Sequence, residues 1–398
     1  MQVTINKSTA NGIVKAPASK SMAHRYIVSA GLSNGVSEVT NVDFSEDIKA
    51  TLSCIESLGA KVEKGANSAK VTGVTKYPSE AVFNCNESGS TMRFFMGIAM
   101  GLGIKAKFYG SKTLLTRPFS IYEEIIEKLG GTFERHEDYI YVDAKLKPDT
   151  YGIKANISSQ FISGLLFALP LLDGDSKIKL IPPIESRSYI NLTLEALDSF
   201  GVKVNWDNDT ELSIKGNQEY KSSNIEVEGD YSNAAFLDAF NYLGGDVKVT
   251  GLKEASLQGD KVYKEYFEKL KRGNITLDIS DCPDLGPVLM ALAGALNGAT
   301  FTGTKRLKIK ESDRGSVMCE ELSKFGVKSE ISENQITIKH VEMAPPSAIL
   351  SGHNDHRIVM SLVILLTITG GKIDEAEAVR KSYPGFFEDI KKLGIEVL

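Results

Sequence analysis

The stretch CIESLGAKV, residues 54–62, predicts the end of an amphipathic helix, a turn at glycine and a short strand. Related stretches follow: IIEKLGGTF (125–133), ALDSFGVKV (196–204), YFEKLKRGNI (266–275), ELSKFGVKS (321–329) and DIKKLGIEV (389–397). In five copies the glycine directly follows a Leu or Phe. In the fourth copy, Gly273 comes three residues after Leu270. Glycine is the residue expected just beyond a helix C-terminus, where φ is positive.

The spacing of these copies predicts the organisation of the chain. The Leu or Phe lies at positions 58, 129, 200, 270, 325 and 393, which gives steps of 71, 71, 70, 55 and 68 residues. Units of this length are too long for a solenoid repeat and are typical of a small αβ subdomain. We therefore expect an α/β fold of six such units in two halves of three, with IEVEGDYSN (225–233) as the crossover between the halves.

Composition narrows the class of protein. The 398 residues carry a net charge of −5, which does not suit the backbone of a nucleic acid. The amino terminus, MQVTINKSTANG, has no apolar run, and the longest apolar stretches, FISGLLFALPLL and IVMSLVILLTI, are shorter than the ~18 residues of a membrane span. We expect a cytoplasmic protein without a membrane segment or a nucleic-acid partner.

Cysteine and histidine offer little for metal binding. The four cysteines are far apart and form no CxxC pair, so neither a disulfide framework nor a structural zinc is predicted. His353 and His356 form a lone HxxH without further ligands at metal spacing. We expect no metal and no organic cofactor.

Charged residues mark the start of the first predicted helix, in PASKSMAHR (17–25). Ser19 suits the N-cap, Lys20 and Ser21 then lie in the first turn, and Arg25 follows Ser21 by four residues on the same face. A cation in the first turn opposes the helix dipole, whereas the backbone N–H groups there favour an anion. The pattern indicates a negative ligand, although a solvated charged face explains this one helix equally well.

Hydroxyl groups or cations also open other apolar helices. The residues concerned are Ser88, Gly89, Ser90, Thr91 and Arg93; Ser158, Ser159 and Gln160; Ser186 and Tyr189; and Asp355, His356 and Arg357. Gly89 allows a ligand to approach the backbone closely. A single serine cap is routinely structural, but several such helices together indicate N-termini that converge on one anionic ligand.

Further charges stand near other helix starts. Arg117 directly precedes a proline that we expect to begin a helix. The other candidates are Lys310, Glu311, Asp313 and Arg314 in IKESDRGS, and Lys381 in a predicted loop before the last helix. Asp284 precedes an apolar helix, where a carboxylate is either an N-cap or, among several cations, a proton acceptor.

The order of these motifs resembles one known family. SKSMAHR, ESGSTMR, RP, SSQF, EGD, CPD, IKESDR, NDHR and KSYPGFF occur as in the 5-enolpyruvylshikimate-3-phosphate synthase family, from about Lys15 to Phe387. The resemblance implies a two-domain inside-out α/β fold with three βαβαββ units per domain. The implied domains are residues 15–228, mainly for shikimate 3-phosphate, and residues 1–14 plus 229–398, mainly for phosphoenolpyruvate. The chain would cross near Val14–Lys15 and near Glu228–Asp230.

The resemblance also implies the reaction and its residues. The enolpyruvyl group of phosphoenolpyruvate would be transferred to the 5-hydroxyl of shikimate 3-phosphate, through a tetrahedral intermediate with release of phosphate, in aromatic amino acid biosynthesis, by a monomer without cofactors. The implied catalytic residues are Asp284, Glu311, Lys20 and Lys381. Those for shikimate 3-phosphate are Lys20, Ser21, Arg25, Ser158, Ser159, Gln160, Ser186, Tyr189, Asp284 and Lys310. Those for phosphoenolpyruvate are Lys20, Gly89, Arg117, Gln160, Arg314, His356, Arg357 and Lys381.

Within this pattern Asp284 would be the base that faces the 5-hydroxyl. Glu311 would handle the proton on carbon, with Lys20 or Lys381 as alternatives. His24 departs from the family pattern, because Asn usually precedes Arg25.

Three other functions are alternatives to the one that the resemblance implies. The sister enolpyruvyl transferase that acts on UDP-N-acetylglucosamine usually carries a catalytic Cys or Asp in a loop whose counterpart here, GSKTLLTRPFS, contains no Cys. A non-catalytic anion-binding protein would have no reason to keep both Asp284 and Glu311. A relative that modifies nucleic-acid ends is disfavoured by the acidic composition.

Overall fold

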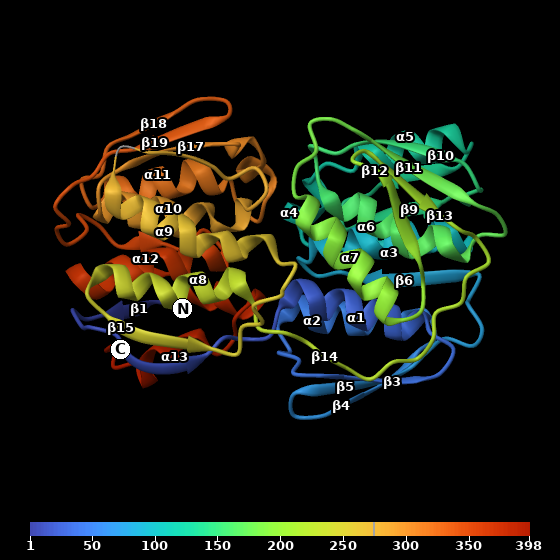
Figure 1. Cartoon of the computed structure of the whole chain (residues 1–398), viewed down its shortest axis with the longest axis horizontal. Helices are drawn as coiled ribbons and strands as arrows, with labels where there is room; N and C mark the ends of the chain where they lie inside the picture. Colours follow the sequence, from blue (N-terminus) through green and yellow to red (C-terminus); the bar gives the residue numbers. More distant parts are fainter. Residues whose placement is uncertain (274) are drawn as a thin grey trace. The chain divides into compact units, whose positions relative to one another are not determined.

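The computed structural model describes residues 1–273 and 275–398, so Asn274, in the fourth copy of the recurring stretch, lies outside the described residues. The chain forms two compact units. Figure 1 shows the chain with colours that follow the sequence from the N-terminus to the C-terminus. Unit 1 combines residues 1–19 with residues 229–398, and unit 2 consists of residues 20–228. Each unit is described by itself below.

Unit 2 is built from three four-stranded sheets, in the orders β14-β3-β5-β4, β6-β7-β9-β8 and β10-β11-β13-β12. Its strands are β3 (Val36–Thr40), β4 (Lys61–Lys64), β5 (Ser68–Thr72), β6 (Glu80–Asn84), β7 (Lys105–Tyr109), β8 (Thr132–Arg135), β9 (Tyr139–Asp143), β10 (Thr150–Lys154), β11 (Ser176–Ile181), β12 (Val204–Asn208), β13 (Glu211–Ile214) and β14 (Ile225–Glu226). Its helices are α1 (Lys20–Leu32), α2 (Glu46–Ser57), α3 (Gly89–Leu102), α4 (Lys112–Thr116), α5 (Ser120–Lys128), α6 (Ser159–Ala168), α7 (Arg187–Ser199) and the 3-10 helix η1 (Leu169–Leu171).

The three sheets of unit 2 share one topology. In each, the first two strands pair in parallel and the other neighbours are antiparallel, as in β6–β7, β7–β9 and β8–β9. A parallel pair requires a crossover connection, which α3 and α6 supply for the second and third sheets. In the first sheet the parallel partner of β3 is β14, near the end of the unit, because the chain enters this unit at a helix. This topology agrees with the βαβαββ pattern expected from the repeats.

Unit 1 contains one sheet of the same order, β16-β17-β19-β18, and two smaller ones, β1-β21-β20 and β15-β2. Its strands are β1 (Val3–Ile5), β2 (Asn11–Lys15), β15 (Asp246–Thr250), β16 (Thr276–Asp278), β17 (Ala299–Thr302), β18 (Ser329–Ile331), β19 (Gln335–Ile338), β20 (Leu350–Ser351) and β21 (Gly371–Asp374). Its helices are α8 (Tyr231–Asp238), α9 (Tyr263–Arg272), α10 (Gly286–Ala295), α11 (Arg314–Ser323), α12 (His356–Thr369) and α13 (Phe386–Lys392), with the 3-10 helices η2 (Ala239–Leu243), η3 (Gly259–Val262), η4 (Pro283–Leu285), η5 (Thr304–Ile309) and η6 (Ala376–Lys381).

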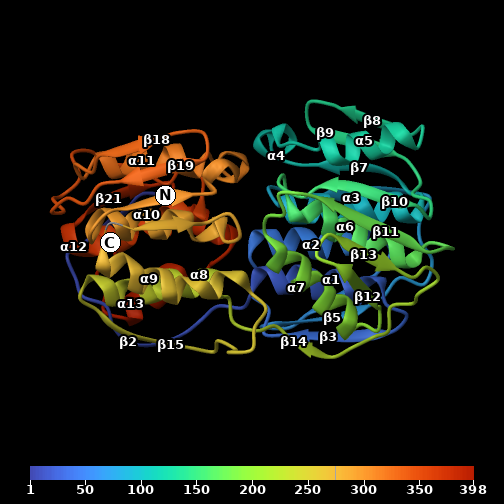
Figure 2. The ribbon, with the colours of Figure 1, turned by 45° about the horizontal axis from the view of Figure 1, so that its top comes forward.

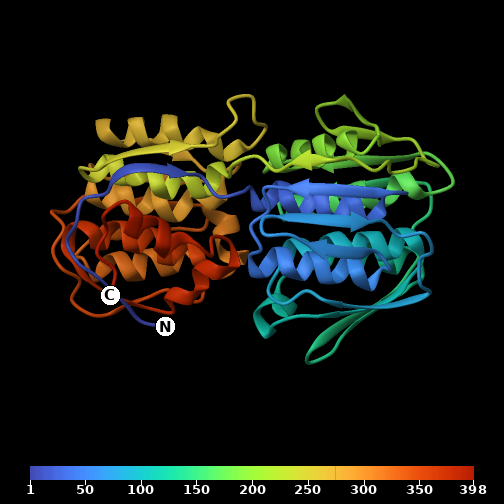
Figure 3. The same cartoon turned by 90° about the horizontal axis from the view of Figure 1, so that it is seen from below.

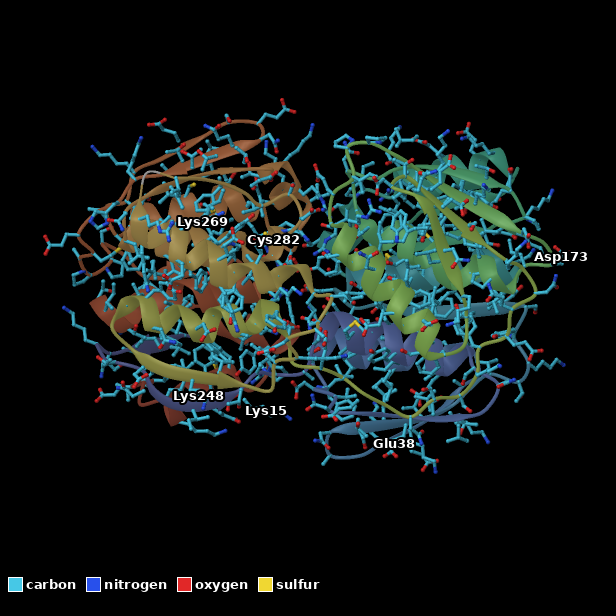
Figure 4. All side chains as sticks on the ribbon, in the orientation of Figure 1. Lys15, Glu38, Asp173, Lys248, Lys269 and Cys282 are labelled. Carbon is cyan, nitrogen blue, oxygen red and sulfur yellow. The ribbon has the colours of Figure 1, made fainter. Side chains whose placement is uncertain are left out.

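The amino terminus completes the two smaller sheets of unit 1. Strand β1 pairs antiparallel with β21, and β2 pairs in parallel with β15, beside which it runs in Figure 3. The exposed side chains of Lys15 on β2 and Lys248 on β15 belong to this strand pair (Figure 4). The chain was expected to cross near Val14–Lys15, but residues up to Ser19 stay with unit 1. They do so because Ala18 bridges Gly229 and the carbonyl of Pro17 accepts the N–H of Asp230 at 2.8 Å.

Helices that are apolar on all sides lie inside unit 2, with the sheets outside (Figure 2). Almost every residue of α3 and α6 is buried, as is required of a helix without a polar face. Small residues let these two helices touch. A Cβ added at Gly97 would lie 2.5 Å from the carbonyl carbon of Gly164, and one added at Gly101 would lie 2.7 Å from the Cβ of Ala168. This contact brings the N-terminal ends of α3 and α6 together.

The glycines of the recurring stretch adopt the predicted conformation. Gly59, Gly130, Gly201, Gly273, Gly326 and Gly394 have φ values of 106°, 69°, 79°, 68°, 86° and 91°. A residue with a side chain is strained at such angles, which explains why each of these helices ends at a glycine.

Two further findings concern the expectations from composition. Cys54, Cys85, Cys282 and Cys319 are buried and unpaired. Within residues 1–273 and 275–398, every helix is too short or too polar to cross a membrane.

We predict that Gly97→Ala lowers the free energy of unfolding by about 2 kcal/mol, because the new methyl group pushes α3 away from the backbone of α6. Urea denaturation measures this. Gly152→Ala is the matched control, since its Cβ would meet only a side-chain carbon at 3.8 Å and should change stability by less than about 0.5 kcal/mol. Equal stability of the two variants would contradict the contact.

Candidate functional site

The N-terminal ends of α3 and α6 are capped by the serines that precede them. Ser88 Oγ accepts the N–H of Thr91 at 3.2 Å, and Ser158 Oγ accepts the N–H of Gln160 at 3.3 Å. These caps account for the two hydroxyl groups in the ordinary structural way. Ser159, the first residue of α6, is also buried.

Arg25 joins four helices of unit 2. From α1, its Nε donates to Thr193 Oγ1 of α7 at 2.8 Å, and its Nη2 donates to the carbonyl of Tyr189 at 3.0 Å. Its guanidinium lies 5.3 Å from the centre of the Phe94 ring of α3, and Nη2 is 3.4 Å from Ser163 Oγ of α6. Burial lowers the pKa of Arg25 to about 10, so it stays charged at neutral pH. The structure thus holds a buried cation near the N-terminal ends of these helices.

Lys20 is paired with an acidic residue that the sequence analysis did not single out. Lys20 Nζ lies 2.8 Å from Asp47 Oδ2 in the first turn of α2, and both side chains are mostly buried. Ser21 follows Lys20 at the start of α1, and its carbonyl accepts a hydrogen bond from Arg25 Nη1 at 2.8 Å. The cation in the first turn of α1 is therefore balanced within the protein.

A series of hydrogen bonds links α1, α2 and the start of α3 in unit 2. His24 Nδ1 lies 2.6 Å from Thr51 Oγ1, which lies 2.7 Å from Thr91 Oγ1, which in turn donates to Ser88 Oγ at 2.7 Å. Burial, followed by the charges of Lys20 and Arg25, holds the pKa of His24 well below its usual value. A neutral His24 therefore ties α1 to α2 and to the start of α3.

Gly89 faces two arginines. A Cβ at Gly89 would lie 2.8 Å from Arg117 Nη1 and 3.1 Å from Arg93 Nη1, so a side chain at this helix start would displace the ends of these two arginines. Arg93 Nη1 donates to Gln160 Oε1 at 2.5 Å, and Gln160 Nε2 donates to Ser90 Oγ at 2.8 Å. The starts of α3 and α6 are thereby linked around Gly89. Proline does not begin a helix here as predicted: Pro118 lies between Arg117 and the N-cap, Phe119, of α5.

Ser186 is a buried residue in a strained conformation. It precedes α7 with φ 57° and ψ 40°, in the left-handed region that a serine rarely occupies. Tyr189, one turn on, has its ring 6.0 Å from the guanidinium of Arg25. The strained turn and the arginine thus lie at the same end of α7.

In unit 1, the first residue of α11 is a fully buried arginine surrounded by carboxylates. Arg314 donates through Nε to Asp355 Oδ2 at 2.8 Å, through Nη1 to Asp284 Oδ1 at 2.8 Å and through Nη2 to Glu311 Oε2 at 2.6 Å. Burial lowers the pKa of Arg314, but the charges of Asp355, Glu311 and Asp284 outweigh it and raise the pKa above its usual value. Arg314 is therefore a permanent cation that fixes three acids around one centre.

Asp284 touches three cations. Besides Arg314, Lys310 Nζ lies 3.2 Å from its Oδ1, and Arg357 Nη2 donates to its Oδ2 at 3.1 Å. Burial raises the pKa of Asp284, but the charges of Arg357, Lys310 and Arg314 hold it well below the usual value. Asp284 lies within η4 and Leu285 takes the N-cap position of α10, so the N-cap interpretation of Asp284 is wrong. Its carboxylate is therefore ionised at neutral pH.

Lys310 loses its proton more readily than an ordinary lysine. Burial lowers its pKa to about 8, because the opposing charge of Asp284 only partly compensates for the loss of solvent. Lys310 follows η5 and is one residue from Glu311. The charge of Lys310 therefore changes within an accessible range of pH.

Asp355 organises the start of α12. It is fully buried, caps the helix by accepting the N–H of Arg357 at 2.9 Å and accepts a hydrogen bond from Ser312 Oγ at 3.1 Å. His356, the first residue of α12, is buried with Nδ1 at 3.8 Å from Asp355 Oδ1. Lys381 ends η6, not a loop as predicted, and its Nζ donates to the carbonyl of Asn354 at 2.6 Å.

The predicted residues thus form two groups, one in each unit. The N-terminal cluster of unit 2 contains Lys20, Ser21, Arg25, Gly89, Arg117, Ser158, Ser159, Gln160, Ser186 and Tyr189. The arginine–carboxylate cluster of unit 1 contains Asp284, Lys310, Glu311, Arg314, His356, Arg357 and Lys381. Several partners that hold these side chains were not predicted from the sequence. They include Asp47, which binds Lys20, and Thr193, which binds Arg25. The contact of Asp355 with Arg314 was not predicted either. Only Asp355 carried a signal, because it precedes an apolar helix like an N-cap.

Comparisons with known proteins show the family to which the chain is similar. The family described as EPSP synthase (3-phosphoshikimate 1-carboxyvinyltransferase) matches residues 5–390. A 3-phosphoshikimate 1-carboxyvinyltransferase of Clostridium kluyveri is 40% identical over 417 residues, which cover 99% of this chain and 98% of the relative. One of Clostridium perfringens is 42% identical with the same coverage. The structure of EPSP synthase from Acinetobacter baumannii shares the fold, with a TM-score of 0.78, 22% identity and coverage of 100% and 99%.

We predict that Asp355→Ala lowers the free energy of unfolding by about 3–5 kcal/mol, because it uncaps α12 and removes a carboxylate from a buried arginine. Asp355→Asn should lose about 1 kcal/mol less, since asparagine still caps a helix. Urea denaturation measures both. Glu320→Ala, an exposed position of α11, is the control and should change stability by less than about 0.5 kcal/mol. If Asp355→Ala behaves like this control, the cluster does not stabilise the unit.

Proposed function

The chain belongs to the EPSP synthase family, and we propose that it transfers the enolpyruvyl group of phosphoenolpyruvate to the 5-hydroxyl of shikimate 3-phosphate. The observation that carries this function is the similarity along the whole chain to relatives with that activity in their name. The UDP-N-acetylglucosamine enolpyruvyl transferase is not favoured by these relatives.

The charges of the two clusters suit these substrates. Two phosphates near −1.5 to −2 each and two carboxylates bring roughly five or six negative charges. The predicted ligands include the cations Lys20, Arg25, Arg117, Lys310, Arg314, Arg357 and Lys381. Arginine binds carboxylate and phosphate through two parallel hydrogen bonds, which suits substrates that carry both groups.

We assign shikimate 3-phosphate to Ser21, Arg25, Ser158, Ser159, Gln160, Ser186 and Tyr189 of unit 2, with Lys20, and to Lys310 and Asp284 of unit 1. Arg25 is fixed by two other helices and is charged, which suits it to the shikimate carboxylate. Ser158 and Ser159 lie at a helix N-terminus, where backbone N–H groups favour the 3-phosphate.

We assign phosphoenolpyruvate to Lys20, Gly89, Arg117, Gln160, Arg314, His356, Arg357 and Lys381. The bare Cα of Gly89 beside the Arg117 guanidinium leaves space for a small anion. Arg314 engages three carboxylates, so its part is chiefly to fix the neighbouring groups.

The reaction needs three proton transfers. The 5-hydroxyl oxygen bonds to C2 of phosphoenolpyruvate while its proton goes to a base, and C3 receives a proton to give the tetrahedral intermediate. Elimination then breaks the C2–O bond to phosphate and removes a proton from the C3 methyl group. Asp284 is assigned as the base because its carboxylate is ionised at neutral pH and can accept the proton, although the cations on both of its oxygens make it a weak base. Glu311 is assigned the carbon proton, with Lys20 and Lys381 as alternatives.

The function is tested by phosphate release from the purified chain with phosphoenolpyruvate and shikimate 3-phosphate, each omitted in turn. Release should require both substrates, and Asp284→Ala should reduce kcat by about 10²–10⁴-fold, as expected for loss of a general base. UDP-N-acetylglucosamine serves as the substitute acceptor. Release only with that acceptor would overturn the proposal, and an active Asp284→Ala would overturn the assignment of the base.

A second prediction concerns pH. Lys310 is protonated below its pKa of about 8. The kcat/KM for shikimate 3-phosphate should therefore fall as pH rises through 8, because Lys310, which is assigned to this substrate, loses its positive charge. The substrate phosphates do not cause this fall, because their second pKa is near 6. Lys310→Arg stays charged to above pH 12 and should remove the fall. The same fall in Lys310→Arg would show that another group is responsible.

A further inference from the structure

Helix α11 carries two buried charged side chains, Arg314 and Glu321, which are seven residues apart. Seven residues are about two helical turns, so both project from one face. Arg314 binds Asp355, and Glu321 binds Ser351 and His353. One helix face therefore holds both ends of the loop 351–355, which connects β20 to α12.

Glu321 is fully buried and well supplied with donors. Its Oε2 accepts the N–H of Ser351 at 3.0 Å, and its Oε1 lies 2.9 Å from His353 Nε2. Lys324 Nζ donates to both oxygens at 2.8 Å. A buried carboxylate is costly to desolvate, and these hydrogen bonds offset that cost.

The loop that it holds needs external support. His353 and Asn354 both have positive φ, at 48° and 51°, which costs of order 1–3 kcal/mol for each such residue. A Cβ at Gly352 would lie 2.6 Å from Val359 Cγ2, so the loop also packs tightly on α12. The contacts of Glu321 with Ser351 and His353 hold it in this conformation.

Three residues assigned to phosphoenolpyruvate depend on this loop. His356 and Arg357 directly follow it at the start of α12, and the carbonyl of Asn354 binds Lys381 Nζ at 2.6 Å. In contrast, the residues assigned to shikimate 3-phosphate in unit 2 have no part in it.

A metal ion is the other explanation for these groups. Ligand atoms of Glu320, Glu321 and His353 lie within 4.8 Å of one another. However, the ammonium group of Lys324 lies on both oxygens of Glu321 and already supplies the positive charge. The contacts therefore favour a clamp on the loop.

We propose that Glu321 is a positioning residue for phosphoenolpyruvate, a role that rests on the proposed function. Through Ser351 and His353 it holds the strained loop in the one conformation that aims His356, Arg357 and Lys381. It does not touch the reacting atoms.

The test compares Glu321→Gln with Glu320→Gln, the same substitution at the exposed neighbouring position, in the full chain. We expect Glu321→Gln to raise KM for phosphoenolpyruvate about tenfold, because small displacements of substrate-positioning groups are expensive. The kcat and the Kd for shikimate 3-phosphate from titration calorimetry should stay close to those of the wild type, whereas the unfolding temperature should fall, because Lys324 and His353 lose a buried charged partner. Glu320→Gln should match the wild type throughout.

A purely structural role would instead weaken the binding of shikimate 3-phosphate together with that of phosphoenolpyruvate, and this would overturn the proposal, as would an unchanged KM. If Glu321→Gln does not fold, His353→Asn decides, since asparagine accepts positive φ but loses the contact of the histidine ring. It should raise the same KM, and an unchanged value would overturn the clamp. A wild-type chain without turnover would overturn the proposed function, and this inference with it, whereas an active wild type confines any failure to the clamp.

Discussion

The structure depends on the burial of helices that have no polar face. Helices α3, α6, α10 and α12 are apolar almost throughout and must be covered by protein on all sides. The sheets of each unit supply this cover, and the remaining polar atoms of the helices are those of their ends. Caps and charged side chains therefore gather at the N-terminal ends, where backbone N–H groups need partners. The clusters follow from this packing.

Arginine is the residue around which both clusters are built. Arg25 binds hydroxyl and carbonyl groups and lies against an aromatic ring, whereas Arg314 binds three carboxylates. A guanidinium keeps its charge when buried and offers donors in several directions. The partners of the two arginines differ in charge. The groups around Arg25 are neutral and do not neutralise its guanidinium. The three carboxylates around Arg314 neutralise its guanidinium and are held in position by it. Buried ion pairs give little net stability, so the second arrangement suits chemistry better than folding.

The sequence predicted several helix ends and N-caps, but few of the side chains that contact the candidate site residues. The glycine after each recurring helix has the predicted positive φ, and the N-caps Ser88, Ser158 and Asp355 lie where the helix starts were expected. Asp284 was left open between an N-cap and a proton acceptor, and its place within η4, with Leu285 as the N-cap of α10, excludes the first. The extension of unit 1 to Ser19 depends on the contacts of Pro17 with Asp230 and of Ala18 with Gly229, which no local sequence pattern predicts.

The sequence by itself determined where the recurring helices end and where several apolar helices begin, because capping and turn geometry are decided within four or five neighbouring residues. It misplaced the helix start near Arg117 and the N-cap of α10. It also determined which helices are buried, through their lack of a polar face. Only the tertiary structure decided which charges meet. Arg25 and Thr193 are 168 residues apart and Arg314 and Asp355 are 41 apart. Such contacts form when packed helices bring distant segments together, and the strength of each depends on burial that exists only in the folded chain.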